Sequence, residues 1–174
     1  MTTGDTLKTH WQSQGMPVLS GVSSELITRF ESEHRVILPS DMRDYFEAVN
    51  GMAMHFPHDQ DKNGFTFFPL EQLRTVTEEA RIMKNKWILS SAADSLFVFC
   101  DYLTWCWVYA IHLSRDPSKA NRVVIIGGQR KEPVIAASFS EFVELYVGDS
   151  PELYQANSIV DRATDPIGFK VDGI

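Results

Sequence analysis

The chain has 174 residues, of which 44% are hydrophobic and 22% charged; this is typical of one globular domain and too apolar for a disordered protein. Its net charge is −7, which argues against direct nucleic-acid binding because that affinity depends on Lys and Arg side chains that displace counterions. The opening segment contains Asp5, Lys8 and His10 and no apolar run, so we expect no secretory signal and predict a cytoplasmic protein without membrane attachment.

Three helices are predicted in the N-terminal part of the chain. The first helix is predicted between Asp5 and Gly15. Asp5 is its expected N-cap, and Gly15 lies just past its C-terminal end. A connector over residues 16–22 leads to a second helix, which Ser23 or Ser24 is expected to cap.

The second helix carries Leu26, Ile27 and Phe30 on one face. It must end before Pro39, because the residue that precedes a proline avoids helical backbone angles. Ser40 is the expected cap of the third helix.

The third helix has the clearest pattern of the three. Its apolar side chains recur at i, i+3, i+4 and i+7, so they must face a core. They are Met42, Tyr45, Phe46 and Val49. Asn50-Gly51 is expected to stop this helix as a left-handed C-cap.

After this helix the pattern becomes extended. Phe65–Phe68 is rich in strand-forming residues, and Pro69 is expected to open a helix over Leu70–Ile82. Four short strands are then predicted at residues 87–89, 96–100, 105–112 and 122–126.

A hairpin and a helix are predicted at the end of the domain. Gly127-Gly128 begins the turn, and residues 133–136 form the returning strand. Ser138 and Glu141 form a capping box for the last helix, which Gly148 closes. The core face of that helix consists of Phe139, Phe142, Val143 and Tyr146.

Helices, then antiparallel strands, then a final helix are typical of an α+β domain. Residues 105–110 are apolar on both faces, so this strand is expected in the middle of the sheet. We predict a mostly antiparallel, twisted sheet of about five to six strands with helices packed against it. Residues 1–154 form this single domain, and residues 155–174 are interpreted as a C-terminal extension packed on it.

Two motifs suggest metal binding, and neither is complete. Residues 59–64 (Asp-Gln-Asp-Lys-Asn-Gly) copy the first half of an EF-hand calcium loop, but Leu70 stands where the bidentate carboxylate is required. A polar, hairpin-like loop is the better interpretation. His55 and His58 precede it without a fixed geometry and are interpreted as surface side chains. We expect neither a metal nor a cofactor.

No catalytic constellation is visible, so we predict that the protein is not an enzyme. Cys100 and Cys106 lie in apolar stretches, where burial makes a thiol inert, and are interpreted as two small buried hydrophobes. Their positions on either side of a predicted turn would also let them face each other across a hairpin. Ser138 and Ser140 are better explained by helix capping, and no G-x-S-x-G motif is present.

One predicted hairpin gathers the candidate partner-binding residues. They are Asp94, Asp101, Tyr102, Trp105 and Trp107. Two interpretations stay open: the rings fill the core of the sheet, or rings bordered by acidic side chains form a surface that binds a basic partner.

Several blocks resemble the signature of the SUKH superfamily, which includes the fungal Smi/Knr cell-wall regulators and many bacterial immunity proteins. The first blocks are Phe30-Glu31, Leu38-Pro39, Tyr45-Phe46 and Asn50-Gly51, in the order F-E…L-P…y-f…N-G. Further likeness lies at residues 68–73, 87–89 and 138–142. One departure is Ala92-Ala93-Asp94-Ser95, where members often have an Asp-Gly-x-Gly-like turn.

The resemblance implies a non-catalytic protein that binds and neutralises a cognate toxin domain, often a nuclease or another nucleic-acid-modifying enzyme. The net charge of −7 is compatible with a basic toxin. The alternative is a regulatory scaffold or adaptor that binds cellular proteins without a toxin partner.

Overall fold

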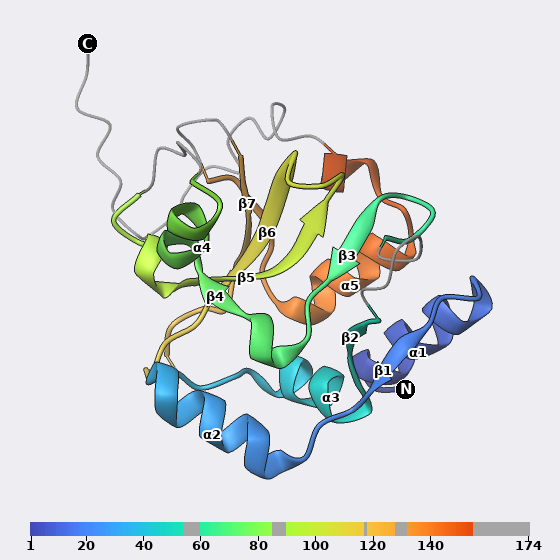
Figure 1. Cartoon of the computed structure of the whole chain (residues 1–174), viewed down its shortest axis with the longest axis horizontal. Helices are drawn as coiled ribbons and strands as arrows, with labels where there is room; N and C mark the ends of the chain where they lie inside the picture. Colours follow the sequence, from blue (N-terminus) through green and yellow to red (C-terminus); the bar gives the residue numbers. More distant parts are fainter. Residues whose placement is uncertain (54–59, 85–89, 117, 128–131, 155–174) are drawn as a thin grey trace.

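One antiparallel sheet forms the centre of the molecule, and helices pack against it (Figure 1). The structure is a computed structural model that describes residues 1–53, 60–84, 90–116, 118–127 and 132–154. Its sheet has six strands, so the predicted α+β class and number of strands are confirmed.

The described residues contain five α-helices and eight strands. The helices are α1 (Thr3–Ser13), α2 (Ser24–His34), α3 (Ser40–Ala48), α4 (Val76–Ile82) and α5 (Phe139–Val147). The strands are β1 (Val18–Ser20), β2 (Val49–Met52), β3 (Phe65–Phe67), β4 (Arg74–Thr75), β5 (Leu96–Tyr102), β6 (Trp107–His112), β7 (Val123–Ile126) and β8 (Val134–Ala136). Three short 3-10 turns complete the set: η1 (Leu70–Gln72), η2 (Ala93–Ser95) and η3 (Pro151–Tyr154).

The strand order of the main sheet is β3-β5-β6-β7-β8, and β4 also pairs with β5. All of these pairings are antiparallel. The prediction that β6 is a central strand is confirmed, because it lies between β5 and β7 and its residues 108–111 are buried. β1 and β2 form a separate two-stranded sheet.

Phe67 of β3 lies where several helices meet the sheet. Its ring centroid is 5.1 Å from that of Trp11 in α1, 6.5 Å from Tyr45 in α3 and 4.8 Å from Tyr146 in α5. On the same core, Phe30 of α2 packs against Phe97 of β5 at 6.0 Å. Aromatic side chains therefore join α1, α2, α3 and α5 to the sheet, as their bulk and shape favour.

The predicted apolar stripe of α3 is confirmed, since Met42, Tyr45 and Phe46 are buried, but the predicted end of this helix is wrong. The chain passes straight into β2, and Asn50-Gly51 lies inside this strand. Gly51 has φ +78°, and a Cβ there would come within 2.8 Å of backbone atoms of the Phe67–Pro69 segment. Close contact between two backbones, not helix termination, therefore requires this glycine.

The single helix predicted over Leu70–Ile82 is also wrong. The segment forms η1, then β4, then α4. Thr75 ends the extended part and caps α4, with its hydroxyl accepting from the Glu78 amide and the Glu78 carboxylate accepting from the Thr75 amide. Arg74 and Thr75 instead pair with Val98 and Phe97 of β5, so this backbone segment bonds to the sheet and not within a helix.

The N-terminal expectations need smaller corrections. Thr2, not Asp5, is the N-cap of α1, and Asp5 is the acidic partner of its capping box. The connector over residues 16–22 contains β1. Pro39, not Ser40, takes the N-cap position of α3.

The central hairpin differs from the prediction at its turn. β5 continues through Tyr102, so the turn occupies residues 103–106 and Trp105 belongs to it. Cys100 is buried and pairs with Tyr109, whereas Cys106 is exposed in the turn. The two cysteines therefore do not face each other, and only Cys100 is a buried hydrophobe.

The strands of the last hairpin and the last helix follow the prediction closely, whereas the predicted turn from Gly128 lies outside the described residues. β8 pairs with β7, and Ser138 accepts from the Glu141 amide at 3.1 Å. The Glu141 carboxylate instead accepts from the amide of Ala137, one residue earlier than a capping box requires. The four predicted core residues of α5 are buried.

Some predictions concern parts of the chain that lie outside the described residues. They are the strand at 87–89, the loop containing His55, His58 and Asp59, and the extension over 155–174. Among the described residues no helix is long and apolar enough to cross a membrane.

Candidate partner-binding surface

The structure separates Asp94 from the other four candidate binding residues. Asp94 is exposed in η2, immediately before β5, whereas Asp101 and Tyr102 end that strand. Seven residues of strand span about 20 Å, so Asp94 belongs to the opposite end of the sheet. Whether any of these residues binds a partner stays a prediction.

Tyr102 and Trp107 form a half-exposed stack at the hairpin end. They are register partners on β5 and β6, with ring centroids 4.4 Å apart and planes at 22°. Tyr154 of η3 meets the Tyr102 ring edge-on at 5.6 Å. The Trp107 indole donates to the Tyr109 hydroxyl at 2.9 Å, which fixes the indole orientation. Tyr102, Trp107 and Tyr154 are called the ring stack below.

Trp105 does not join the ring stack. It lies in the turn and stacks instead on Phe68, with centroids 5.8 Å apart and planes at 26°. The neighbouring Leu103 is 47% exposed and was not among the predicted binding residues. Its position in a predicted turn could have indicated this exposure, because turns lie on the protein surface. Tyr154 was also missed, since only its contact with Tyr102 across the fold places it here.

Asp101 is buried beneath the turn rather than displayed on it. Leu103, Thr104 and Trp105 all have left-handed φ values, of 47°, 53° and 69°, which are unfavourable for residues with a Cβ. One carboxylate oxygen of Asp101 accepts from the Trp105 amide at 2.7 Å, and Leu103 donates its amide to the Gly64 carbonyl at 2.8 Å. Asp101 therefore holds the strained turn in place and does not face solvent.

The buried position of Asp101 predicts a dependence of stability on pH. Burial raises the pKa of this carboxyl to about 6, although the amides of Trp105 and Tyr102 oppose the shift. In the unfolded chain the pKa is about 3.9, so the stabilising contribution is complete below that pH and is lost as the pH rises through about 6. Between pH 5 and 7.5 this loss amounts to about 1 kcal/mol.

We expect Asp101→Asn to abolish that contribution while it keeps an acceptor for the Trp105 amide. Urea unfolding of both proteins at pH 5 and pH 7.5 measures it, and the wild type should lose about 1 kcal/mol more than the variant. An identical pH dependence in the two proteins would mean that Asp101 does not titrate in this range.

Asp61, which belongs to the partial EF-hand motif, has a structural role in the fold. One of its carboxylate oxygens accepts from the amides of Asn63 and Phe65, at 2.8 and 2.9 Å. The other accepts from the Tyr146 hydroxyl at 2.5 Å, and Trp11 donates its indole N–H to that hydroxyl at 2.8 Å. Both oxygens already accept from protein donors, which agrees with the interpretation of a polar turn.

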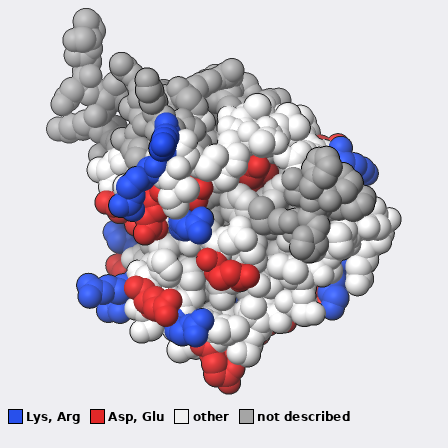
Figure 2. Space-filling model, in the orientation of Figure 1, with Lys and Arg blue, Asp and Glu red and all other residues white. Residues whose placement is uncertain are grey.

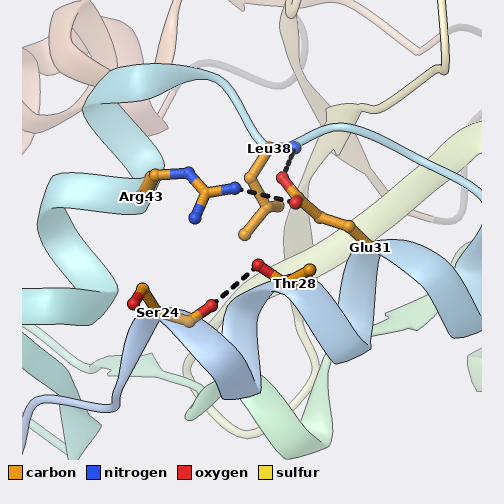
Figure 3. A network of polar contacts seen from close by, with 5 residues as sticks. All are labelled: Ser24, Thr28, Glu31, Leu38 and Arg43. Atoms are coloured by element: carbon orange, nitrogen blue, oxygen red, sulfur yellow. Dashed lines mark hydrogen bonds and ion pairs between the residues drawn. The ribbon is translucent and has the colours of Figure 1, made fainter.

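The family-like blocks of the sequence contact one another in space. Glu31 of α2 accepts from the Leu38 amide at 2.8 Å and from the Arg43 guanidinium of α3 at 2.7 Å (Figure 3). In the same view Thr28 donates to the carbonyl of Ser24 within α2. Phe30-Glu31 and Leu38-Pro39 therefore work together, because one carboxylate joins two helices and the segment between them.

Asn50 makes a second such contact. Its side-chain oxygen accepts from the Leu70 amide at 2.8 Å, and its side-chain nitrogen donates to the Glu71 carboxylate at 3.0 Å. The Asn50 side chain thus ties β2 to η1, and both of its ends are used although the residue is buried.

A groove of about 380 Å³ lies between α2 and η1. Its walls include Leu26, Arg29 and Phe30 from α2, and Leu70 and Glu71 from η1. Acidic and basic side chains are interspersed over α2 and α4, whereas the surface over the β5–β6 hairpin is mostly uncharged (Figure 2). Leu26, predicted to face the core, is 40% exposed on this groove.

These features define the class of protein: an α+β domain built around one main antiparallel sheet, in which the partly buried Glu31 ties α2 to α3 and the buried Asn50 ties β2 to η1. The sequence matches the SMI1/KNR4 family (SUKH-1) over residues 21–145, more than half of the chain, and the protein belongs to this family. The suspected SUKH relationship is confirmed, and the matched range contains both polar ties. No individual curated protein matches the chain significantly.

Proposed function

We propose that this protein is an immunity protein, which binds a cognate bacterial toxin domain and blocks it without catalysis or a cofactor. Membership of the SUKH family supports this function, because the family includes toxin-immunity proteins. The protein acts in the cytoplasm, where a toxin directed at nucleic acids would meet its target, and it needs no contact with nucleic acid or membrane.

The half-exposed ring stack carries the binding role. Tyr and Trp are the side chains that most often dominate the energy of protein interfaces, because each buries a large rigid surface and keeps a polar group for hydrogen bonding. Tyr102 and Trp107 are already held against each other at 4.4 Å, so little side-chain freedom is lost on binding. Trp105 and Leu103 extend this surface along the turn.

The charge of the chain indicates the partner. A nuclease or another nucleic-acid-modifying toxin is expected to be basic, because its substrate is a polyanion. The net charge of −7 speeds the encounter with such a partner. Exposed Asp94 contributes to this attraction, whereas buried Asp101 acts indirectly by holding the turn.

Co-expression with the toxin domain encoded beside this protein tests the function. We expect protection of the cells, and a 1:1 complex with nanomolar affinity or better, about −12 kcal/mol. Trp107→Ala should weaken the complex by about 2 kcal/mol, the level of an interface hot spot. Ile82→Ala, which truncates an exposed apolar side chain on α4, should leave the affinity unchanged.

The same complex tests the charge argument. Asp94→Lys should slow association and weaken its salt dependence. Glu47→Lys, on the exposed surface of α3, changes the net charge equally and should slow association less, because it tests the net charge apart from the position of Asp94. Absence of both protection and binding would remove the immunity function. Binding to several cellular proteins without protection would instead favour a regulatory scaffold.

A further inference from the structure

The groove between α2 and η1 has an apolar interior that the described residues leave open. Leu26 and Phe30 lie one turn apart on α2, and Leu70 faces them from η1. Phe30 and Leu70 are largely buried, but Leu26 keeps 40% of its surface exposed. A volume of about 380 Å³ falls in the range of about 300–1000 Å³ that is usual for ligand pockets.

A carboxylate stands on the η1 wall in a fixed orientation. The buried Asn50 donates to one oxygen of Glu71 at 3.0 Å, and the Leu70 amide fixes Asn50 in turn at 2.8 Å. Glu71 itself is exposed to the groove, and a carboxylate can accept about four hydrogen bonds. Such a group is oriented before any ligand arrives, which lowers the entropy lost on binding.

The α2 wall supplies no comparable site for an anion. Arg29 is its basic side chain in the groove and pairs with Glu33 at 3.7 Å, while both side chains remain mostly exposed. The His34 ring packs against Phe30 and Phe97, at 4.4 and 5.5 Å. With Glu33 paired to Arg29, Glu71 is the groove carboxylate that faces a ligand without a cationic partner in the described residues, and it favours a positively charged ligand.

We propose that this groove binds a segment of the partner protein in which an arginine follows an apolar side chain. The apolar side chain packs on Leu26, Phe30 and Leu70, and the guanidinium donates to Glu71. Arginine suits this carboxylate because its planar fork forms two parallel hydrogen bonds and is more weakly hydrated than the lysine ammonium. That the segment belongs to a toxin rests on the proposed function. The preference of the groove for an apolar side chain followed by arginine does not depend on that function.

Two small peptides separate charge recognition from apolar contact. The probes are N-acetyl-leucyl-arginine amide and the same peptide with neutral citrulline in place of arginine, titrated into the intact protein while backbone amide NMR shifts are followed. We expect NMR shifts around Leu26, Phe30 and Glu71. The arginine peptide should bind about fivefold more tightly than the citrulline peptide, which is the usual gain in affinity from one charge-assisted hydrogen bond that stays in partial contact with water.

Three variants make this test specific. Glu71→Gln keeps an acceptor for Asn50 but should remove the preference for arginine. Glu47→Gln, an exposed change on α3, should preserve it. Leu26→Ala should weaken both peptides equally, and because this side chain is 40% exposed the change should cost little folding stability.

Three results would overturn the assignment of the groove. The two peptides could bind equally, the preference for arginine could survive Glu71→Gln, or the NMR shifts could be confined to another surface. Failure of the immunity function is a separate result. A chain that protects cells but shows no arginine preference keeps that function and loses this groove assignment. A chain that shows the preference but does not protect keeps the groove and loses the immunity function.

Discussion

Replacement of Phe67 by alanine is expected to lower the free energy of unfolding by about 3–5 kcal/mol, the usual cost of emptying an aromatic core site. Phe67 is fully buried, and its ring contacts rings of α1, α3 and α5 as well as Phe99 of β5, at 6.2 Å. Because the surrounding side chains belong to several elements, they cannot collapse together into the cavity.

Urea or guanidinium unfolding at constant pH measures this loss. Phe67→Leu is the matched control, because it keeps most of the apolar volume and should cost much less than the alanine variant. A loss below about 1 kcal/mol for Phe67→Ala, the scale of surface substitutions, would mean that this ring is not the junction of helices and sheet.

Asp61→Ala is expected to cost about 3 kcal/mol, because it removes one acceptor group and leaves several buried donors without a partner. The amides of Asn63 and Phe65 lose their acceptor, as does the Tyr146 hydroxyl. Asp61 is itself buried, so water cannot readily replace it. The same change loosens α1, since Trp11 donates to that tyrosine.

Chemical denaturation and near-ultraviolet circular dichroism follow the two consequences. The stability loss should be accompanied by a weakened tryptophan and tyrosine signal as the Trp11–Tyr146 contact relaxes. Asp61→Asn retains a carbonyl acceptor and should cost less, while exposed Glu144→Ala on α5 should change neither quantity by more than about 0.5 kcal/mol. A loss for Asp61→Ala no larger than that of Glu144→Ala would show that the carboxylate network is dispensable.

The candidate binding surface was only partly accessible from the sequence. The predicted hairpin exists, but its strand continues through Tyr102, and the pairing register of β5 and β6 brings Tyr102 beside Trp107. The predicted strand at residues 96–100 already implied that Asp94 and Asp101 lie toward its opposite ends, but the candidate residues were grouped by their closeness in the chain. The sequence could not show that the carboxylate of Asp101 turns inward to hold the Trp105 amide.

Local patterns determined much of the fold without any structure. The apolar spacing of Met42, Tyr45 and Phe46 placed the core face of α3, and Ser138 marked the start of α5. These signals work because helix periodicity and capping depend on hydrogen bonds and side chains within about four residues of each other. Residues 105–110 are apolar on both faces of their strand, and this pattern likewise identified β6 as a central strand.

The tertiary structure alone decided the features whose partners lie far away in the chain. Asn50-Gly51 reads as a helix stop, yet Asn50 accepts from Leu70, 20 residues on, and Gly51 lies against the β3 segment. Asp61 reads as half of a calcium loop, yet its second oxygen accepts from Tyr146, 85 residues away. A buried polar group must be paired, and the sequence around it does not say which distant element brings the partner.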